Sequence, residues 1–274
     1  MRIPDGETAV ICRLPGTLDD WMRIEVIAAL AAACIVWTTS AGATTHAVTG
    51  EAHDARTTRL LYREHHVLRP SDTQPAERLI VYRCADGIAF ARKRVDYRTS
   101  RIAPEFAFED ARSGHREGLR RAGGAVHLRS GKKERALRAS PTLVADAGFD
   151  EYLRTHWATL AGGGERVVPF AVPAFGRALD FRITRLDAGQ VAGTPVERFR
   201  LTLDGMLGAL APKLDVDYDA RSRRLRRFTG VTDLRDDRGK PLNVRIDFPQ
   251  APVMVPAEAW SQAESQPLRA CKLG

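Results

Sequence analysis

Short runs in which apolar and polar residues alternate dominate the sequence after residue 57. Turn signals such as Asp86-Gly87, Ser113-Gly114 and Gly123-Gly124 separate these runs. Alternation with a period of two predicts strands with one buried face, and two-residue breaks with glycine are typical of antiparallel hairpins. The first half of the pattern therefore predicts a meander of strands at residues 59–68, 78–84, 88–97, 105–110, 115–121, 125–129 and 133–138.

The period changes to three and four residues between Asp146 and Leu160. An aspartate at the start, which is a suitable N-cap, and three glycines after the end predict a single amphipathic helix. A lone helix in a sheet protein buries its apolar stripe most simply against the sheet. The stripe consists of Phe149, Leu153, Trp157 and Leu160.

Clean alternation resumes after the helix, with one apolar face and one face of arginine and aspartate residues that can pair across strands. A sheet with this many strands should curl rather than stay flat. The predicted fold class is mainly β: a large curled antiparallel sheet, or half-open barrel, with one amphipathic helix packed in its concave face. The strands of this second half are expected at residues 166–172, 177–186, 196–204, 213–219, 223–229 and 242–248.

Two segments show little periodicity. Residues 44–57 are polar and are expected to form a mobile start. The segment from Pro249 onwards contains several prolines and is expected to be a tail that runs back over the body. The remaining pattern fits one β-rich domain over residues 44–274.

The segment before this domain has the features of an export signal. Met22-Arg23 is followed by a mostly apolar run over residues 24–37 and by small residues that end at Ala43. A short basic start, an apolar stretch and a small-residue exit predict a signal peptide cut after Ala43, and the run is too short for a transmembrane helix. Residues 1–21 are then interpreted as lying upstream of the true start. The protein is expected in the periplasm.

Lipid attachment at Cys34 is the minority alternative. The residues around Cys34 resemble a lipoprotein cleavage box, but Ala31 stands where such a box has a larger aliphatic residue. An apolar Ile-Val-Trp sequence follows Cys34 in place of a polar tether. We therefore favour a cleaved leader, with no transmembrane segment in the mature chain.

Charge and cysteine content add two expectations. The chain has a formal net charge of +8, and loss of three basic and five acidic residues with the leader raises this to +10. Such a charge favours anionic partners, here a lipid or another anionic envelope component rather than nucleic acid. Cys84 and Cys271 remain after the leader is removed. An even pair in an oxidising compartment predicts one disulfide, the alternative being two free thiols.

The sequence contains none of the common motifs of catalytic, metal-binding or nucleotide-binding sites. No GxSxG, SxxK, HExxH, P-loop or GxGxxG pattern occurs, so no catalytic residue, metal or cofactor is predicted. His65 and His66 are adjacent on one predicted strand, so they point to opposite faces and cannot share a metal. His115 and Glu117 share a face of another strand and leave open a hydrolase with a spatial cluster of acids and histidine.

Four stretches resemble a group of exported proteobacterial proteins of unknown function. They are Leu61-Tyr-Arg-Glu-His and residues 106–118, 146–154 and 218–225. In architecture, a curled antiparallel sheet that holds a helix is similar to the periplasmic lipoprotein carriers LolA and LolB. The resemblance implies the fold, and it transfers no lipid-contact residue to this chain.

These observations favour a carrier that binds a lipid or other apolar ligand in the concavity of the sheet. The alternative is a cell-envelope scaffold or interaction module without a small ligand. An apolar cavity beneath the helix would favour the carrier, and a solid core with a charged flank would favour the scaffold. The residues expected to line the concavity or its core are Phe106, Phe108, Phe149, Trp157, Phe170, Phe181 and Phe199.

Overall fold

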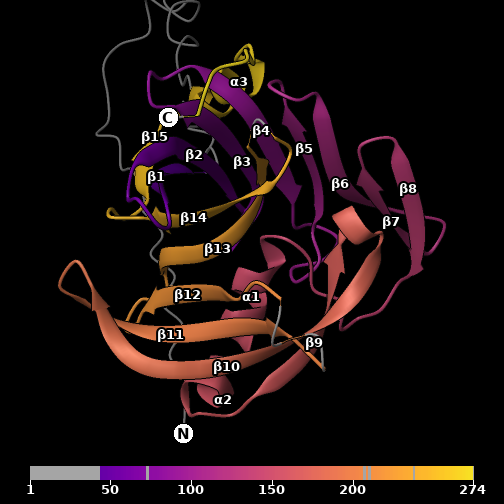
Figure 1. Ribbon diagram of the computed structural model, residues 1–274, viewed down its shortest axis with the longest axis vertical. Coiled ribbons are helices and arrows are strands. Elements are labelled where there is room, and N and C mark those ends of the chain that lie inside the picture. Colours follow the sequence, from indigo (N-terminus) through magenta and orange to yellow (C-terminus); the bar gives the residue numbers. More distant parts are fainter. Residues whose placement is uncertain (1–43, 72–73, 206–207, 209–210, 237, 274) are drawn as a thin grey trace, which may run out of the picture. The chain divides into compact units, whose positions relative to one another are not determined.

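The computed structural model describes residues 44–71, 74–205, 208, 211–236 and 238–273. The predicted leader lies outside these residues. In the described part, fifteen strands form one antiparallel sheet that curls around a helix (Figure 1). The strands are β1 (Thr45–Asp54), β2 (Leu60–Ser71), β3 (Gln74–Cys84), β4 (Ala89–Asp96), β5 (Glu105–Asp110), β6 (His115–Ala122), β7 (Ala125–Ser130), β8 (Lys133–Arg138), β9 (Arg166–Val172), β10 (Arg177–Val191), β11 (Thr194–Leu203), β12 (Leu214–Asp219), β13 (Leu225–Arg235), β14 (Pro241–Asp247) and β15 (Val253–Val255).

The sheet consists of two meanders joined side by side. Strands β1 to β8 pair in chain order, and so do strands β9 to β14. The junction is the antiparallel pair of β1 and β14, in which Ala52 lies opposite Ile246. The predicted fold class, a large curled antiparallel sheet or half-open barrel, is confirmed.

A short segment before the first helix links β9, the first strand of the second meander, to the first meander. The Val144 N–H donates a hydrogen bond to the Pro169 carbonyl on β9 at 2.9 Å, and the Ala171 N–H donates to the Val144 carbonyl at 2.8 Å. The next residue, Ala145, donates to the Ile102 carbonyl after β4 at 2.9 Å. This segment therefore holds β9 near the loop that follows β4, which keeps the sheet curled.

The predicted single helix is two short helices, α1 (Gly148–Thr155) and α2 (Trp157–Ala161). They are separated at His156, whose ring stacks on Tyr152 with 4.1 Å between ring centroids and donates to the Tyr152 carbonyl at 2.9 Å. The expectation that Asp146 caps the helix was wrong. The N-cap is Ala147, and Asp146 adopts a left-handed φ of 44° while its carboxylate binds Lys93.

The apolar stripe of these helices packs on the inner face of β9 to β12, as the sequence predicts. Leu153 and Leu160 are fully buried there. The Trp157 ring meets the rings of Phe199 and Tyr218 edge to face, with centroid distances of 5.5 and 6.1 Å. Aromatic pairs in this arrangement add to the stability that burial of the apolar surface provides.

The start of the domain is ordered, which corrects the expectation of a mobile segment over residues 44–57. Strand β1 occupies most of it and is hydrogen-bonded to β2, β14 and β15. Its residues, THAVTGEAHD, are mostly small or polar, so the strand has no strong apolar face of its own. Gly50 lies against the Phe248 ring, where a Cβ would come within 2.6 Å of a ring carbon. Pairing with its neighbours, more than burial of side chains, forms this strand.

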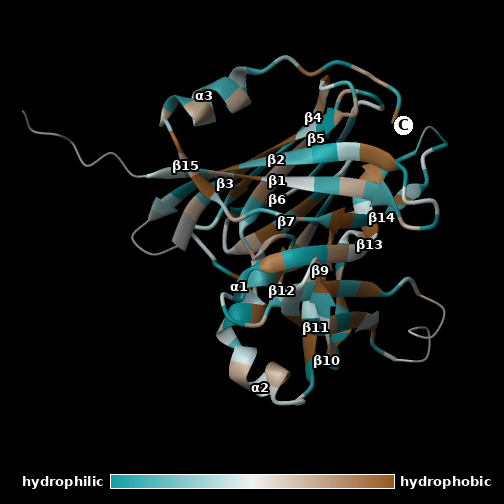
Figure 2. Cartoon of the chain, turned by 90° about the vertical axis from the view of Figure 1, so that its left-hand side faces the viewer, coloured by the Kyte–Doolittle hydropathy of each residue, from teal (hydrophilic) through white to brown (hydrophobic). Residues whose placement is uncertain are grey.

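The C-terminal tail runs back over the body, but it is more regular than the sequence predicts. It contains β15 and a third helix, α3 (Glu258–Ser265). Figure 2 shows α3 and α1 on opposite sides of β1 to β3. The Trp260 side chain is 1% exposed and packs against Val67 and Leu79 of β2 and β3, which holds α3 against the sheet. The predicted Cys84–Cys271 disulfide is confirmed and ties the end of the tail to β3.

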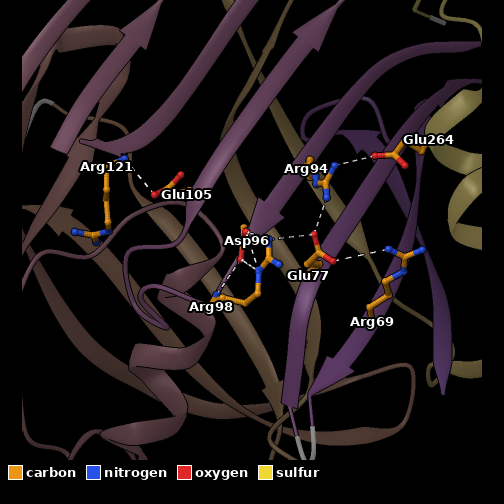
Figure 3. Close-up of polar contacts among 8 residues, drawn as sticks. All are labelled: Arg69, Glu77, Arg94, Asp96, Arg98, Glu105, Arg121 and Glu264. Carbon is orange, nitrogen blue, oxygen red and sulfur yellow. Dashed lines mark hydrogen bonds and ion pairs between the residues drawn. The ribbon is translucent and has the colours of Figure 1, made fainter. Parts of the chain in front are cut away.

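The outer face beneath the tail carries charged residues that neutralise one another (Figure 3). Glu77 accepts from Arg94 at 2.7 Å and lies 3.8 Å from both Arg69 and Arg98. Arg94 also reaches Glu264 of α3 at 2.9 Å. Pairs of this kind are individually weak when they face solvent, so they align strands and tail more than they stabilise them.

Gly148 provides a test of how tightly α1 is held. A Cβ at this position would lie 2.2 Å from the Ile102 carbonyl oxygen and 2.6 Å from Pro104 Cδ. We expect Gly148→Ala to lower the free energy of unfolding by about 1–3 kcal/mol, because backbone must move to admit the methyl group. The measurement is the midpoint of chemical denaturation. Gly189→Ala is the control, since its Cβ would meet only the flexible end of Arg198, and equal losses in both variants would contradict the prediction.

Candidate functional site

A cavity of about 610 Å³ lies between α1 and the concave face of the sheet. Its wall comes from β1 to β4, from β9, from β11 to β14 and from α1. Several apolar side chains of the inner face are only half-buried, because no protein group fills the space in front of them. These half-buried lining residues include Val48, Phe170, Leu214, Leu225 and Phe228.

The seven aromatic residues singled out in the sequence separate into different places. Phe149 and Phe170 line the cavity. Phe106 and Phe108 on β5 instead line a separate cavity of about 410 Å³. The other three pack in the apolar cluster behind the helices and line none of the described cavities; they are Trp157, Phe181 and Phe199.

Lys93 is a buried charged residue on β4, 5% exposed, and sequence reasoning missed it. Its ammonium donates to Asp146 Oδ1 at 2.5 Å and also to Asp233 Oδ2. It lies 5.4 and 5.8 Å from the ring centroids of Phe106 and Phe108. Burial opposes the charged form, yet the two carboxylates outweigh it and hold the pKa of Lys93 well above its usual range. Lys93 is therefore a fixed cation in the cavity wall.

The second charged group joins α1 to β3 and β12. Arg78 on β3 lies 3.6 Å from Asp150 of α1, and the Tyr218 hydroxyl donates to Asp150 Oδ1 at 2.5 Å. Arg154 of α1 lies 3.9 Å from the same carboxylate. Burial alone would raise the pKa of Asp150, but Arg154 and Arg78 lower it, so the carboxylate is ionised. Burial raises the pKa of Tyr218 well above its usual range, which keeps its hydroxyl as a donor.

His66 and Glu64 form a third pair on β2, with 2.9 Å between Nε2 and Oε2. The His66 ring also meets Phe248 edge to face at 5.4 Å. Its neighbour His65 accepts from or donates to Thr49 Oγ1 at 3.3 Å on the other face of the sheet, as expected for adjacent residues of a strand. No group of three or more His, Cys, Asp and Glu side chains arranged for a metal occurs in the described part of the chain.

His115 and Glu117 on β6 are in contact, at 3.2 Å between His115 Nε2 and Glu117 Oε2. Burial, reinforced by Asp233, raises the pKa of Glu117 to about 7. Burial and Arg235 lower the pKa of His115. The raised pKa brings the titration of the Glu117 carboxyl close to neutral pH. Glu117 lines the smaller cavity together with Phe106 and Phe108, and His115 lines a surface cavity beneath the tail.

Sequence periodicity could not have identified the charged lining residues. Alternation places Lys93 on the same face of β4 as Ala91 and Val95, both of which are fully buried. A lysine at such a position can be recognised as a buried charge only when the carboxylates that pair with it are known. Asp146 and Asp233 lie 53 and 140 residues away along the chain, and nothing in the pattern connects them to Lys93.

No protein-family model matches this sequence, and no curated protein matches it. Among solved structures, the chain is similar to the crystal structure of a β-barrel-like protein of domain of unknown function DUF1849 from Brucella abortus. The two chains share 11% sequence identity, with a TM-score of 0.48 over 78% of this chain and 98% of that chain. The fold and cavity of the present chain define a curled antiparallel β-sheet protein with an internal, largely apolar cavity.

No helix in the described residues is long and apolar enough to cross a membrane.

Lys93→Met tests whether the buried cation holds α1 to β4. We expect the variant to lose about 3 kcal/mol of unfolding free energy, because the buried Asp146 carboxylate is left without its cation. Adding Asp146→Asn should restore part of the loss, since it removes the stranded charge. The measurement is equilibrium denaturation of both variants and of Lys133→Met, an exposed control on β8. No difference between Lys93→Met and Lys133→Met would refute the assignment.

Glu117→Gln tests the raised pKa of the buried acid. Folding raises this pKa from 4.5 to about 7, so the folded state favours the protonated form. Its contribution to stability is complete below pH 4.5 and is lost as the pH rises through about 7. Denaturation midpoints across this range should therefore fall for the wild-type protein and fall less for Glu117→Gln. The exposed control Glu258→Gln should follow the wild type, and identical profiles for all three proteins would contradict the shift.

Proposed function

We propose that this protein is a carrier that binds a lipid or another apolar ligand in the cavity between α1 and the concave face. The cavity itself carries the proposal. Its volume of about 610 Å³ falls within the range of ordinary small-molecule sites, and apolar side chains form most of its wall. Half-buried residues such as Phe228 and Leu214 would lose their remaining contact with water on binding an apolar chain.

The proposed location is the periplasm of the cell that exports the protein. The Cys84–Cys271 disulfide supports it, because disulfides of this kind persist in oxidising compartments. The bond closes a long loop, with 187 residues of sequence separation, and Cys84 is 1% exposed. The predicted leader before residue 44 agrees with export.

The alternative, an envelope scaffold without a small ligand, would need a solid core and a free charged flank. The described outer face has charge, but much of it is internally paired, as in the group around Glu77 (Figure 3). The cavity beneath α1 is the feature that a scaffold would not need. The balance therefore favours the carrier.

Native mass spectrometry of the protein, purified from a periplasmic extract without reduction, tests the carrier directly. A lipid mass that co-purifies and leaves on organic extraction supports the proposal and identifies the ligand class. A bare mass that also fails to take up added lipid counts against it and favours the scaffold. The same spectrum tests cleavage after Ala43 and attachment at Cys34.

Leu225→Trp should close the cavity from β13. Leu225 is half-buried in the cavity wall, so a larger ring there occupies the space that a ligand would use. We expect the affinity for the neutral apolar dye N-phenyl-naphthylamine to fall at least about tenfold, a loss of roughly 1.4 kcal/mol. The control is Val167→Trp on β9, a position that is 46% exposed and lines none of the described cavities. The measurement is a fluorescence titration of the dye into each variant, with melting curves to verify that each variant is folded. Equal dye affinity of Leu225→Trp and the wild-type protein would argue against binding in this cavity.

A further inference from the structure

The charges that line the large cavity are almost completely matched by partners of opposite sign. Lys93 is matched by Asp146 and Asp233, and Glu64 by His66. The carboxylates of α1 are matched in the same way: Asp150 by Arg78 and Arg154, and Glu151 by Arg101 and Arg154. Paired groups of this kind are already satisfied and have little to offer a ligand.

Arg224 is the exception. It lines the cavity beside Leu225, and no carboxylate among the described residues lies within ion-pair distance of its guanidinium. Its Nε is buried and has no hydrogen-bond partner in the described structure. Burial, together with the nearby Arg226, lowers the pKa of Arg224. Asp219 acts in the opposite direction and raises the pKa of Arg224, but it lies beyond ion-pair distance.

The neighbouring Arg226 makes the local excess of positive charge larger. Arg226 is 6% exposed, and its Nη1 donates to the Pro249 carbonyl at 3.1 Å. Its Nε is also buried without a described partner. Arg226 does not line the cavity, so among the described lining residues Arg224 is the cation without an ion-pair partner. An anion in front of Arg224 would supply both a partner charge and a hydrogen-bond acceptor.

We propose that Arg224 receives the anionic head group, a carboxylate or a phosphate, of an amphiphile whose apolar chain lies in the cavity. The inference rests on the proposed carrier function and specifies its ligand class. A guanidinium matches the two oxygens of either anion by a pair of parallel hydrogen bonds. Leu225 and Phe228 line the cavity next to Arg224. The anionic head group of one molecule would therefore contact Arg224 while its apolar chain contacts Leu225 and Phe228.

The test compares two probes of equal chain length, dodecanoate and dodecanol, by displacement of N-phenyl-naphthylamine. Dodecanoate should bind the wild-type protein more tightly than dodecanol. Arg224→Gln should weaken dodecanoate about tenfold, the loss expected for a hydrogen-bonded charge, and leave dodecanol unchanged. Arg224→Lys should recover part of the affinity. Arg221→Gln, an exposed arginine of the same turn, is the matched control and should change neither probe.

The outcomes separate the head group from the carrier function. If dodecanoate and dodecanol bind equally and Arg224→Gln changes neither, the head-group assignment is wrong and the carrier remains. If neither probe nor the dye binds, the carrier proposal fails and the assignment fails with it. Lysophosphatidic acid and inorganic phosphate complete the series. If inorganic phosphate binds tightly through Arg224 and lysophosphatidic acid binds no more tightly than phosphate, the site is one for a free anion. That result would overturn the proposal of an amphiphilic ligand.

Discussion

The structure depends on α1, which faces two parts of the sheet through two different kinds of interaction. Its apolar stripe packs on β9 to β12, where Leu153 is fully buried. Its acidic side, with Asp150, binds Arg78 of β3, and the preceding Asp146 binds Lys93 of β4. Hydrophobic packing alone would attach the helix to one meander only. The ion pairs to the other meander, together with the backbone hydrogen bonds of Val144 and Ala145, connect α1 and the segment before it to both meanders. Figure 1 shows α1 in the concavity of the curled sheet.

The use of apolar packing on one side of α1 and ion pairs on the other also explains why a cavity remains between α1 and the sheet. Charged side chains need their partners at hydrogen-bond distance and cannot collapse onto apolar neighbours, so they set a spacing between α1 and the strands. Residues such as Phe170 and Leu214 then face space rather than close-packed side chains. A buried network of this kind costs desolvation energy that an apolar core would not. A protein that binds an amphiphile has a use for both an open apolar wall and fixed charges.

Local patterns in the sequence predicted most strands, the hairpin turns and the buried stripe of the helices, because each depends on residues close together in the chain. The prediction failed where partners are distant. Strand β1 has a polar sequence and forms because β2 and β14 pair with it. Helix α3 forms around Trp260, whose pocket comes from β2 and β3. Of the seven aromatic residues expected to line the concavity or its core, Phe149 and Phe170 line the large cavity and the other five pack in the apolar clusters of the core. Periodicity gives the face of a strand and not what lies opposite it, so it could not separate these two groups.

The amino-acid sequence by itself determined the class of fold and the first meander, and it limited Cys84 and Cys271 to one disulfide or two free thiols, because alternation, turn residues and cysteine number are local or countable properties. Only the tertiary structure decided where the meanders join, where the helix breaks and which charges meet. The contact of Lys93 with Asp233, and the lack of a hydrogen-bond partner for Arg224 Nε among the described residues, depend on groups from distant parts of the chain. Electrostatic partners are chosen by distance in space, and that distance exists only once the sheet has curled.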